Sequence, residues 1–256
     1  MAGRLPSEVA HRPWPLPAGQ WTMRQSWRDL LFAHWPVDRA LIRPLVPAAL
    51  EVQEFGGTSW IGVVPFRMVG VMRRPWPDLP WISAFPELNV RVYVEYGGKP
   101  GVWFLSLDAT NPVAVWAARR FFHLPYHRAS MSIEERDGSF HYASRRSAAG
   151  AATATGVRES AEFVASYRPT SEVYLARPGT LDHFLTERYC LYAQSPAGVM
   201  VRNEVHHAPW PLQSAQASVT TNTMLRTQGV DIDGAPPVLH FSRRLDVVVW
   251  DAEIVT

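Results

Sequence analysis

Short apolar runs separated by turn residues dominate the hydrophobic pattern from Trp27 onward. Runs of this length, rich in β-branched and aromatic residues, are typical of strands. Gly97 and Gly98 tolerate the positive φ of a tight reversal, so residues 97–101 are predicted to form a hairpin loop. The predicted strands are Leu30 to Trp35, Trp60 to Phe66, Val90 to Tyr96, Val102 to Leu107, Ala129 to Glu135, Phe140 to Arg145, Val199 to His206, Ala215 to Thr220 and Leu245 to Val249.

Two segments carry helical signals instead. In the first, Asn111 to Phe122, the asparagine is a candidate N-cap and Pro112 suits the first helical position. Its apolar face is predicted to consist of Val113, Trp116, Ala117 and Phe121. The second helix is predicted from Thr180 to Arg188, with a buried stripe of Leu181, Phe184 and Leu185.

Many strands, few helices and no regular βαβ alternation predict a mainly β (α+β) fold. The expected architecture is a closed or nearly closed antiparallel β-barrel with two or three short helices. A chain of 256 residues fits one hydrophobic core, so residues 26–256 are predicted to form a single domain. Residues 1–25 lack periodicity and are expected either to form an extended arm whose tryptophans pack onto that domain or to be partly disordered.

Charge and cysteine content narrow the environment. The 25 basic and 23 acidic side chains leave a net charge of +2, and no block of like charge is present, so nucleic acid is not an expected partner. The single Cys190 excludes an internal disulfide, and neither a secretory signal nor a long apolar span is found. We therefore expect a cytoplasmic chain without membrane association, and homo-oligomerisation stays open.

Four sequence blocks carry a family resemblance. They are Val46 to Glu51, the Asn89 to Asp108 hairpin, Phe122 to Tyr126 and His206 to Gln213, which reads HHAPWPLQ. Together they resemble the YqjF-like family of uncharacterised bacterial proteins, within the acetoacetate-decarboxylase-like superfamily, and the likeness runs from about Trp27 to Val249. The resemblance implies a cone-like β-barrel that encloses an active site.

The resemblance also implies candidate site residues. In an ungapped match over Arg28 to Glu51, the active-site arginine of acetoacetate decarboxylase falls on Arg28. One of its active-site glutamates falls on Glu87 and the other near Trp60. Where the decarboxylase carries a proline followed by two lysines, the first of them the Schiff-base nucleophile, this chain has Pro125 followed by Tyr126 and His127.

The lysine content argues against imine chemistry. An iminium intermediate requires a neutral primary amine, which tyrosine, histidine and arginine do not supply. In acetoacetate decarboxylase, a neighbouring cationic group keeps the catalytic lysine neutral. The only lysine, Lys99, lies in the glycine-rich turn, where at a pKa near 10.4 roughly 1 in 2,500 would be neutral at pH 7. We predict that Schiff-base decarboxylation is absent.

Two groups of polar residues are candidates for a cavity. Arg28 and Glu87 form either a pair that holds a carboxylate or carbonyl, or a structural salt bridge. Asn89, Arg91 and Tyr93 share one strand face by their spacing of two, and that face lines either a polar interior or an exposed surface.

His123 and Tyr126 flank Pro125 and are candidates for acid–base or hydrogen-bonding roles, against the alternative that they only pack after the helix. The adjacent His206 and His207 would face opposite sides of a strand, so no metal site is predicted. The chain also lacks a glycine-rich phosphate loop and a nucleophile elbow, and no cofactor is expected.

The expected ligand is a small organic acid or carbonyl compound in an enclosed cavity bordered by these residues, with Glu87, His123 and Tyr126 as catalytic candidates. Two alternatives stay open. One is a non-catalytic small-molecule-binding barrel, and the other is a packed structural or interaction module.

Overall fold

The computed structural model describes residues 8–75, 83–147, 160–232, 234 and 236–255. Strands predominate in it, with three short α-helices and short 3-10 turns. The helices are α1 (Arg39–Ile42), α2 (Pro112–Phe122) and α3 (Leu181–Thr186). The strands are β1 (Met23–Val37), β2 (Glu51–Val52), β3 (Ser59–Arg73), β4 (Phe85–Tyr96), β5 (Lys99–Ala109), β6 (Tyr126–Arg128), β7 (Ser130–Arg136), β8 (Ser139–Arg146), β9 (Ala161–Pro169), β10 (Cys190–Gln194), β11 (Met200–His206), β12 (Gln213–Asn222), β13 (Val238–Val249) and β14 (Glu253–Ile254).

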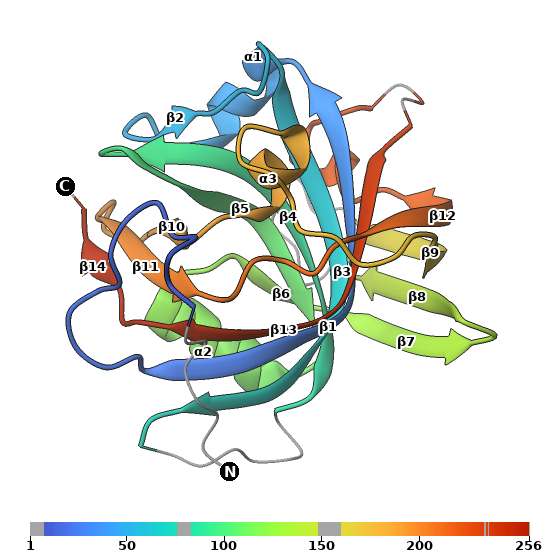
Figure 1. The fold of residues 1–256 in the computed structure, drawn as a ribbon, viewed down its shortest axis with the longest axis horizontal. Helices are drawn as coiled ribbons and strands as arrows, with labels where there is room; N and C mark the ends of the chain where they lie inside the picture. Colours follow the sequence, from blue (N-terminus) through green and yellow to red (C-terminus); the bar gives the residue numbers. More distant parts are fainter. Residues whose placement is uncertain (1–7, 76–82, 148–159, 233, 235, 256) are drawn as a thin grey trace.

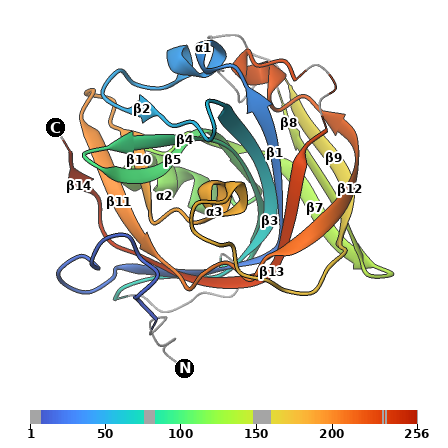
Figure 2. The ribbon, with the colours of Figure 1, turned by 45° about the horizontal axis from the view of Figure 1, so that its top comes forward.

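The sheet curls into a ring. Neighbouring strands run in the order β11-β10-β5-β4-β3-β1-β13, and β13 pairs back with β11 through Val205↔Val249 and His206↔Val248. Figures 1 and 2 show this ring, with β1, β3 and β4 forming one curved wall. The mainly β, acetoacetate-decarboxylase-like fold predicted from the sequence is confirmed. Most neighbouring strands pair antiparallel, as predicted, and β5 pairs in parallel with β10 and β6.

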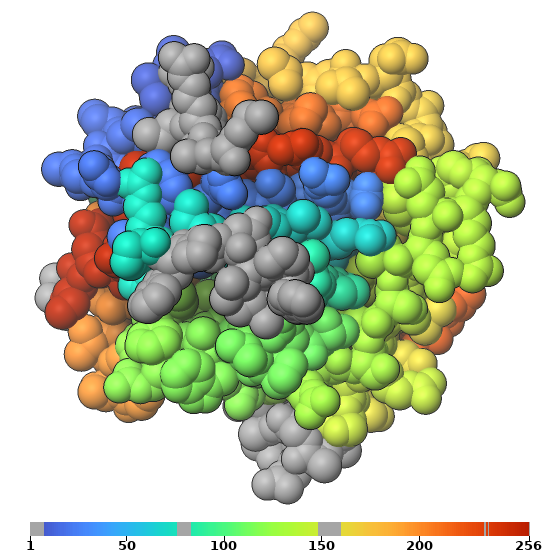
Figure 3. All heavy atoms as spheres, turned by 90° about the horizontal axis from the view of Figure 1, so that it is seen from below, coloured from blue at the N-terminus to red at the C-terminus, as the bar shows by residue number. Residues whose placement is uncertain are grey.

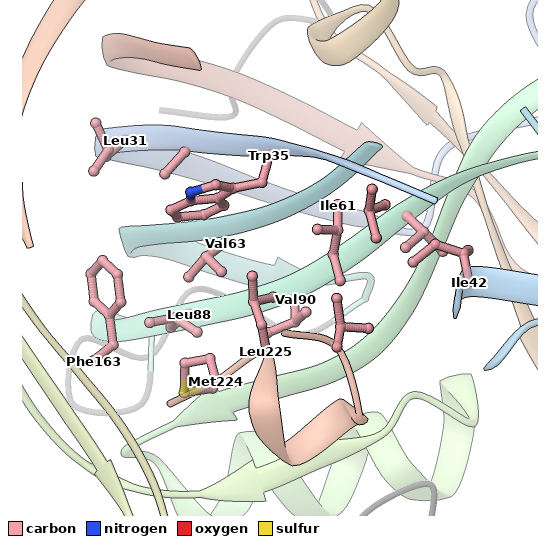
Figure 4. Packing of buried hydrophobic residues seen from close by; sticks show 14 of the residues in the cluster. Leu31, Trp35, Ile42, Ile61, Val63, Leu88, Val90, Phe163, Met224 and Leu225 are labelled. Carbon is pink, nitrogen blue, oxygen red and sulfur yellow. The ribbon is translucent and has the colours of Figure 1, made fainter. Parts of the chain in front are cut away.

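A second layer covers the outside of this wall. The sheet continues from β13 through β12, β9, β8 and β7, which turn away from the ring. Their apolar side chains pack onto the outward-facing side chains of β1, β3 and β4, so that Leu88 and Val90 meet residues such as Phe163 and Met224 (Figure 4). The ring wall is therefore buried on both of its faces, as its near-continuous apolar runs require.

The helix α3 lies across one opening of the ring, at its centre in Figure 2. Thr180 caps the helix, and the fully buried Leu185 packs with Trp60, Tyr93 and Val102. The predicted buried stripe is confirmed for Leu185, whereas Leu181 and Phe184 are only partly buried. Because α3 fills the opening with apolar side chains, it closes this end of the ring.

The helix α2 lies on the opposite side of the ring, on the face that Figure 3 shows from below, close to the end of β3. Asn111 caps it as predicted, accepting hydrogen bonds from the backbone N–H groups of Val113 and Ala114 at 2.9 and 3.1 Å. The predicted buried face is wrong: Trp116 is 61% exposed, and Val113 and Phe121 are also exposed. The face that carries Ala114, Ala118 and Phe122 turns inward instead.

The predicted hairpin is confirmed. Strands β4 and β5 are joined through Gly97 and Gly98, whose φ angles of 59° and 73° are in the left-handed region. Each of the other predicted strands overlaps an observed one, while β9 and the short β2, β6, β10 and β14 were not predicted.

The described part of the N-terminal arm, from residue 8, packs along the ring; residues 1–7 of the predicted arm lie outside the described residues. The Trp14 indole N–H donates to Glu204 at 2.7 Å, and Trp21 is buried against Val248 and Trp250. Arg12 and Lys99 both pair with the same Glu204 carboxylate, at 3.0 and 2.8 Å. In the part of the chain that the structure describes, no helix is long and apolar enough to cross a membrane.

Candidate functional site

A cavity of about 210 Å³ lies inside the ring, between α3 and α2. One buried water needs only roughly 10–15 Å³ on the same measure, so this space is large enough for an organic molecule. Most of its wall is apolar, and aromatic side chains contribute from several elements, including Trp27, Phe66, Phe104 and Trp210. Its polar members are Gln25, Glu87, Asn89, Arg91, Tyr126, Thr186, Arg188, Cys190, Asn203 and His207.

Strand β4 supplies three of these polar groups by simple alternation. Glu87, Asn89 and Arg91 face the cavity, while Leu88 and Val90 between them face the outer core. All three polar residues are at least nine-tenths buried, and Asn89 Oδ1 and Arg91 Nε have no hydrogen-bond partner among the described residues. These two atoms can therefore form hydrogen bonds with a molecule bound in the cavity.

Glu87 and Tyr126 form a hydrogen-bonded pair in the cavity wall. The Tyr126 hydroxyl donates to Glu87 Oε2 at 2.7 Å, and the Tyr142 hydroxyl donates to the Glu87 backbone carbonyl at 2.7 Å. Burial raises the pKa of Glu87 to about 8; the Tyr126 hydrogen bond opposes this shift, and the Asp108 charge adds to it. Near neutral pH, Glu87 is therefore mainly a carboxylic acid able to give up a proton.

Two arginines meet at the α3 end of the cavity. Arg91 and Arg188 lie against the ring of Tyr93, with guanidinium carbons 5.6 and 4.9 Å from its centroid. The Arg91 guanidinium donates to the Leu185 carbonyl at 3.1 Å, and Arg188 Nε donates to the Phe184 carbonyl at 2.8 Å. These bonds hold both charged groups at the C-terminal end of α3, where carbonyl groups are unpaired.

The neutral His34 side chain holds Tyr93 in this position. The Tyr93 hydroxyl donates to the Leu185 carbonyl at 2.7 Å and lies 2.6 Å from His34 Nε2, which must then supply the proton. Burial lowers the pKa of His34 well below its ordinary value, and the Arg91 charge lowers it further. His34 also fits only because Gly62 has no side chain: a Cβ there would come within 2.8 Å of the imidazole.

No carboxylate accepts a hydrogen bond from either arginine among the described residues, and the Glu95 charge, which tends to raise the pKa of Arg188, acts from behind Gln53. The hydrogen-bond acceptors of the two arginines in the described part of the chain are neutral, namely carbonyls, the Tyr93 hydroxyl and the Gln53 side chain. Burial lowers the pKa of Arg188 to about 10, and the neighbouring Arg91 charge contributes to the shift. A buried charge is costly unless it is paired; Arg91 is buried, and Glu95 offsets only part of the effect of burial at Arg188, so this end of the cavity favours an anion.

Four predicted site residues lie outside the cavity wall. Arg28 is on β1 but outside the ring, near Asp246, and it does not meet Glu87. His123 ends α2 with a φ of 54° and is not in the lining. Trp60 and Tyr93 face inward, but they pack against Leu185 and are covered by α3. The structure thus brings together Glu87 and Tyr126, and separately Asn89 and Arg91.

Sequence reasoning missed Arg188 and His207. Arg188 follows α3 and is turned inward by its bond to the Phe184 carbonyl, which no local sequence pattern indicates. His207 lines the cavity and stacks on Tyr189 with a centroid distance of 4.8 Å. Trp210, from the same HHAPWPLQ block, stacks on Trp27 at 5.6 Å and forms an aromatic part of the cavity wall.

Lys99 does not border the cavity, since its ammonium group pairs with Glu204 at 2.8 Å beside the β4–β5 hairpin. Tyr126 occupies the position after Pro125 where the resemblance places a nucleophilic lysine, and its hydroxyl is engaged with Glu87. Among the described residues, no cluster of three or more histidine, cysteine, aspartate or glutamate side chains is suited to hold a metal ion.

Solved structures share this fold. Acetoacetate decarboxylase from Legionella pneumophila superimposes with a TM-score of 0.62 and 13% identity, covering 96% of this chain and 93% of that one. An acetoacetate-decarboxylase-like enzyme from Sphingomonas wittichii gives 0.62 with 11% identity over 96% and 98%. The enduracididine biosynthesis enzyme MppR, complexed with pyruvate, gives 0.59 with 13% identity over 96% and 93%. At these identities the likeness establishes the fold class alone, which is acetoacetate-decarboxylase-like.

Sequence comparison then identifies the family. The model of DUF2071, described as an uncharacterised conserved protein, matches residues 24–246, and the chain belongs to this family. It is 42% identical over 235 residues to the uncharacterised protein YqjF of Bacillus subtilis (strain 168), covering 92% of this chain and 93% of that protein. The predicted resemblance is confirmed.

Proposed function

We propose that this protein binds a small organic acid or carbonyl compound inside the ring and that Glu87 exchanges a proton with it. The observation that carries the proposal is the charge of the cavity wall. The buried Arg91 and the partly buried Arg188 donate hydrogen bonds only to neutral acceptors among the described residues, and Glu95 acts on Arg188 from behind Gln53. The acidic side chain in the wall, Glu87, is largely protonated near neutral pH. An apolar space with this charge favours an anionic organic ligand.

Glu87 and Tyr126 support proton transfer by their geometry. The Tyr126 hydroxyl occupies Glu87 Oε2, so the transferable proton sits on Oε1. A negative charge that develops on a ligand oxygen or carbon would take this proton and leave a Glu87 carboxylate, which the Tyr126 hydrogen bond stabilises. A proton from water then restores the acid. A general acid works best when its pKa lies near the operating pH, which the value of about 8 satisfies.

Imine formation is not part of the proposal, because the single lysine of the chain pairs with Glu204. Incubation with acetoacetate or pyruvate and borohydride should therefore leave the mass of the intact protein unchanged. A stable adduct on Lys99 would contradict this expectation.

A thermal-shift screen with small carboxylic acids, aldehydes and aromatic compounds tests the binding step. Ligands that stabilise the wild type should fail to stabilise Arg91→Met. Arg28→Met is the matched control, since Arg28 is a β1 arginine outside the cavity, and it should retain the full shift. Equal shifts in all three proteins would place binding elsewhere and overturn the proposal.

Turnover separates an enzyme from a non-catalytic binding protein, the alternative that the missing lysine favours. For any ligand found, a catalyst should show a rate that falls with rising pH through about 8 and drops by about 10²–10⁴-fold in Glu87→Gln. If both proteins bind the ligand and neither converts it, the protein is a binding protein and the catalytic part of the proposal is wrong.

A further inference from the structure

The two ends of the cavity carry different chemistry and are well separated. Glu87 and Arg91 are four residues apart on the same strand and face the same side. At about 3.3 Å per strand residue, their Cα atoms are about 13 Å apart. Asp108 is the charged group that shifts the pKa of Glu87, and neither Arg91 nor Arg188 contributes to that shift, which agrees with this separation.

The wall between these ends is apolar. On β3, Val64 lies opposite Asn89 and Phe66 opposite Glu87, and on β5 Leu107 lies opposite Asn89. All three apolar side chains line the cavity. A ligand that reaches from the arginines to Glu87 must therefore pass along an apolar surface, where each buried methylene contributes favourably.

The arginine end is prepared for one carboxylate. Arg91 and Arg188 converge on Tyr93 and are fixed by α3 carbonyls, which keeps two guanidinium groups at one point in the cavity. Arg91 Nε is buried without a partner in the described residues and remains free to donate. Guanidinium groups match carboxylate geometry through paired N–H donors.

From this separation we infer that the ligand is an elongated carboxylic acid with an apolar body and a hydrogen-bonding group, such as a carbonyl or hydroxyl, at its far end. The carboxylate lies at Arg91 and Arg188, and the far group lies at Glu87 and Tyr126. A distance on the order of 10 Å between the ligand carboxylate and its far group corresponds to roughly eight chain atoms. Pyruvate and acetoacetate, in which the carbonyl is adjacent to the carboxylate or one methylene away, are too short to reach both ends. This inference rests on the proposed function, and it specifies the ligand class.

Calorimetric titration with a chain-length series tests the inference. The probes are butanoate, hexanoate, octanoate and 8-hydroxyoctanoate, with pyruvate and acetoacetate as short oxo acids and 1-octanol as the neutral control. For the wild type, affinity should rise about threefold per added methylene, so that octanoate binds about 100-fold more tightly than butanoate. The hydroxyl of 8-hydroxyoctanoate should strengthen binding further in the wild type but not in Glu87→Leu.

Variants separate the ways in which this can fail. Arg91→Met and Arg188→Gln, each checked for folding by circular dichroism, should lose most of the octanoate affinity, whereas the exposed Arg244→Gln should not. Short oxo acids that bind as tightly as octanoate would overturn the inference and leave the proposed function standing. If no carboxylate binds, or if 1-octanol binds as well as octanoate in every variant, the proposed function itself fails.

Discussion

The two faces of the β3-β4-β5 wall are both buried, yet their charged groups have different partners. On the outer face, Asp108 pairs with Arg146 at 2.6 Å, and the two side chains are 0% and 1% exposed. On the inner face, Arg91 donates hydrogen bonds only to neutral acceptors, the Tyr93 hydroxyl and the Leu185 carbonyl. The outer core is also filled by interlocking apolar side chains, whereas the inner face borders an open cavity. The balanced pair contributes to the packed core, whereas under the proposed function the charge beside the cavity binds a ligand.

Breaking the balanced pair should give the largest effect on stability. Arg146→Met leaves Asp108 buried without its counter-charge and should cost about 3–5 kcal/mol in urea unfolding. Arg145→Met is the matched control, because the neighbouring Arg145 pairs with Glu162 at the surface and should cost nothing measurable. Equal losses in the two variants would contradict a structural role for the buried pair.

Core truncations should distinguish the packed face from the hollow one. Leu88→Ala removes a leucine surrounded by the outer core and should cost about 2–5 kcal/mol. Leu107→Ala should cost roughly half as much, because this equally buried leucine already borders the cavity and loses fewer contacts. Urea unfolding of both variants measures the difference, and a larger loss in Leu107→Ala would show that the cavity is filled in solution.

Titration of Glu87 should appear in the pH dependence of stability. Its folded pKa of about 8 lies above the ordinary value of 4.5, so between these values the folded state holds a proton that the unfolded state has released. Stability must therefore fall as pH rises towards 8, by at most about 1.4 kcal/mol per unit. Burial also raises the pKa of Asp108 to about 6 and lowers that of His34, so the contribution of Glu87 is taken as the difference between the wild-type and Glu87→Gln slopes measured from about pH 7 to pH 8. A slope that persists in Glu87→Gln would assign it to another group.

Neutralising the charge beside the cavity should have the smallest effect. Arg91→Met loses its bond to the Leu185 carbonyl, but Tyr93 still donates to that oxygen, and a costly buried charge disappears. We expect the free energy of unfolding to stay within about 1 kcal/mol of the wild type. A loss as large as that of Arg146→Met would mean that Arg91 is structural.

The alternation along β4 explains how much of the site was predictable. Asn89, Arg91 and Tyr93 share a face because strand side chains alternate, and this could be predicted from spacing alone. Which face is inside depends on the outer layer, since only its packing onto Leu88 and Val90 leaves the polar residues to the cavity. That contact joins segments far apart in the chain, and no local pattern indicates it.

Arg28 shows how a single backbone irregularity makes a prediction of side-chain facing from alternation wrong. Leu30 and Phe32 face inward, and continuing that alternation backwards would place Arg28 inside as well. Asp29, with a φ of 53°, interrupts the strand where the register with β3 shifts between Arg28 and Ala33. The extra residue reverses the facing, so Gln25 and Trp27 line the cavity and Arg28 points outward.

The misplaced face of α2 has a similar origin. Trp116 and Phe121 are large apolar residues, but the inward face of the helix carries Ala114, Ala118 and Phe122, and the position of the helix against the ring decides which face is covered. The fold class, by contrast, depends on many short runs and their turns, so it survives errors in the facing of single residues.

Arg91 and Arg188, the arginines of the cavity wall, also bear on how long the folded chain persists in a cell. A ligand that binds only the folded state stabilises it by RT ln(1 + [L]/Kd), about 2.7 kcal/mol when the ligand is at 100 times its Kd. Molecules that unfold are removed by proteases, so occupancy of the cavity would set the abundance of the protein as well as its activity. Under the proposed function, the supply of the ligand thus controls the amount of its own receptor.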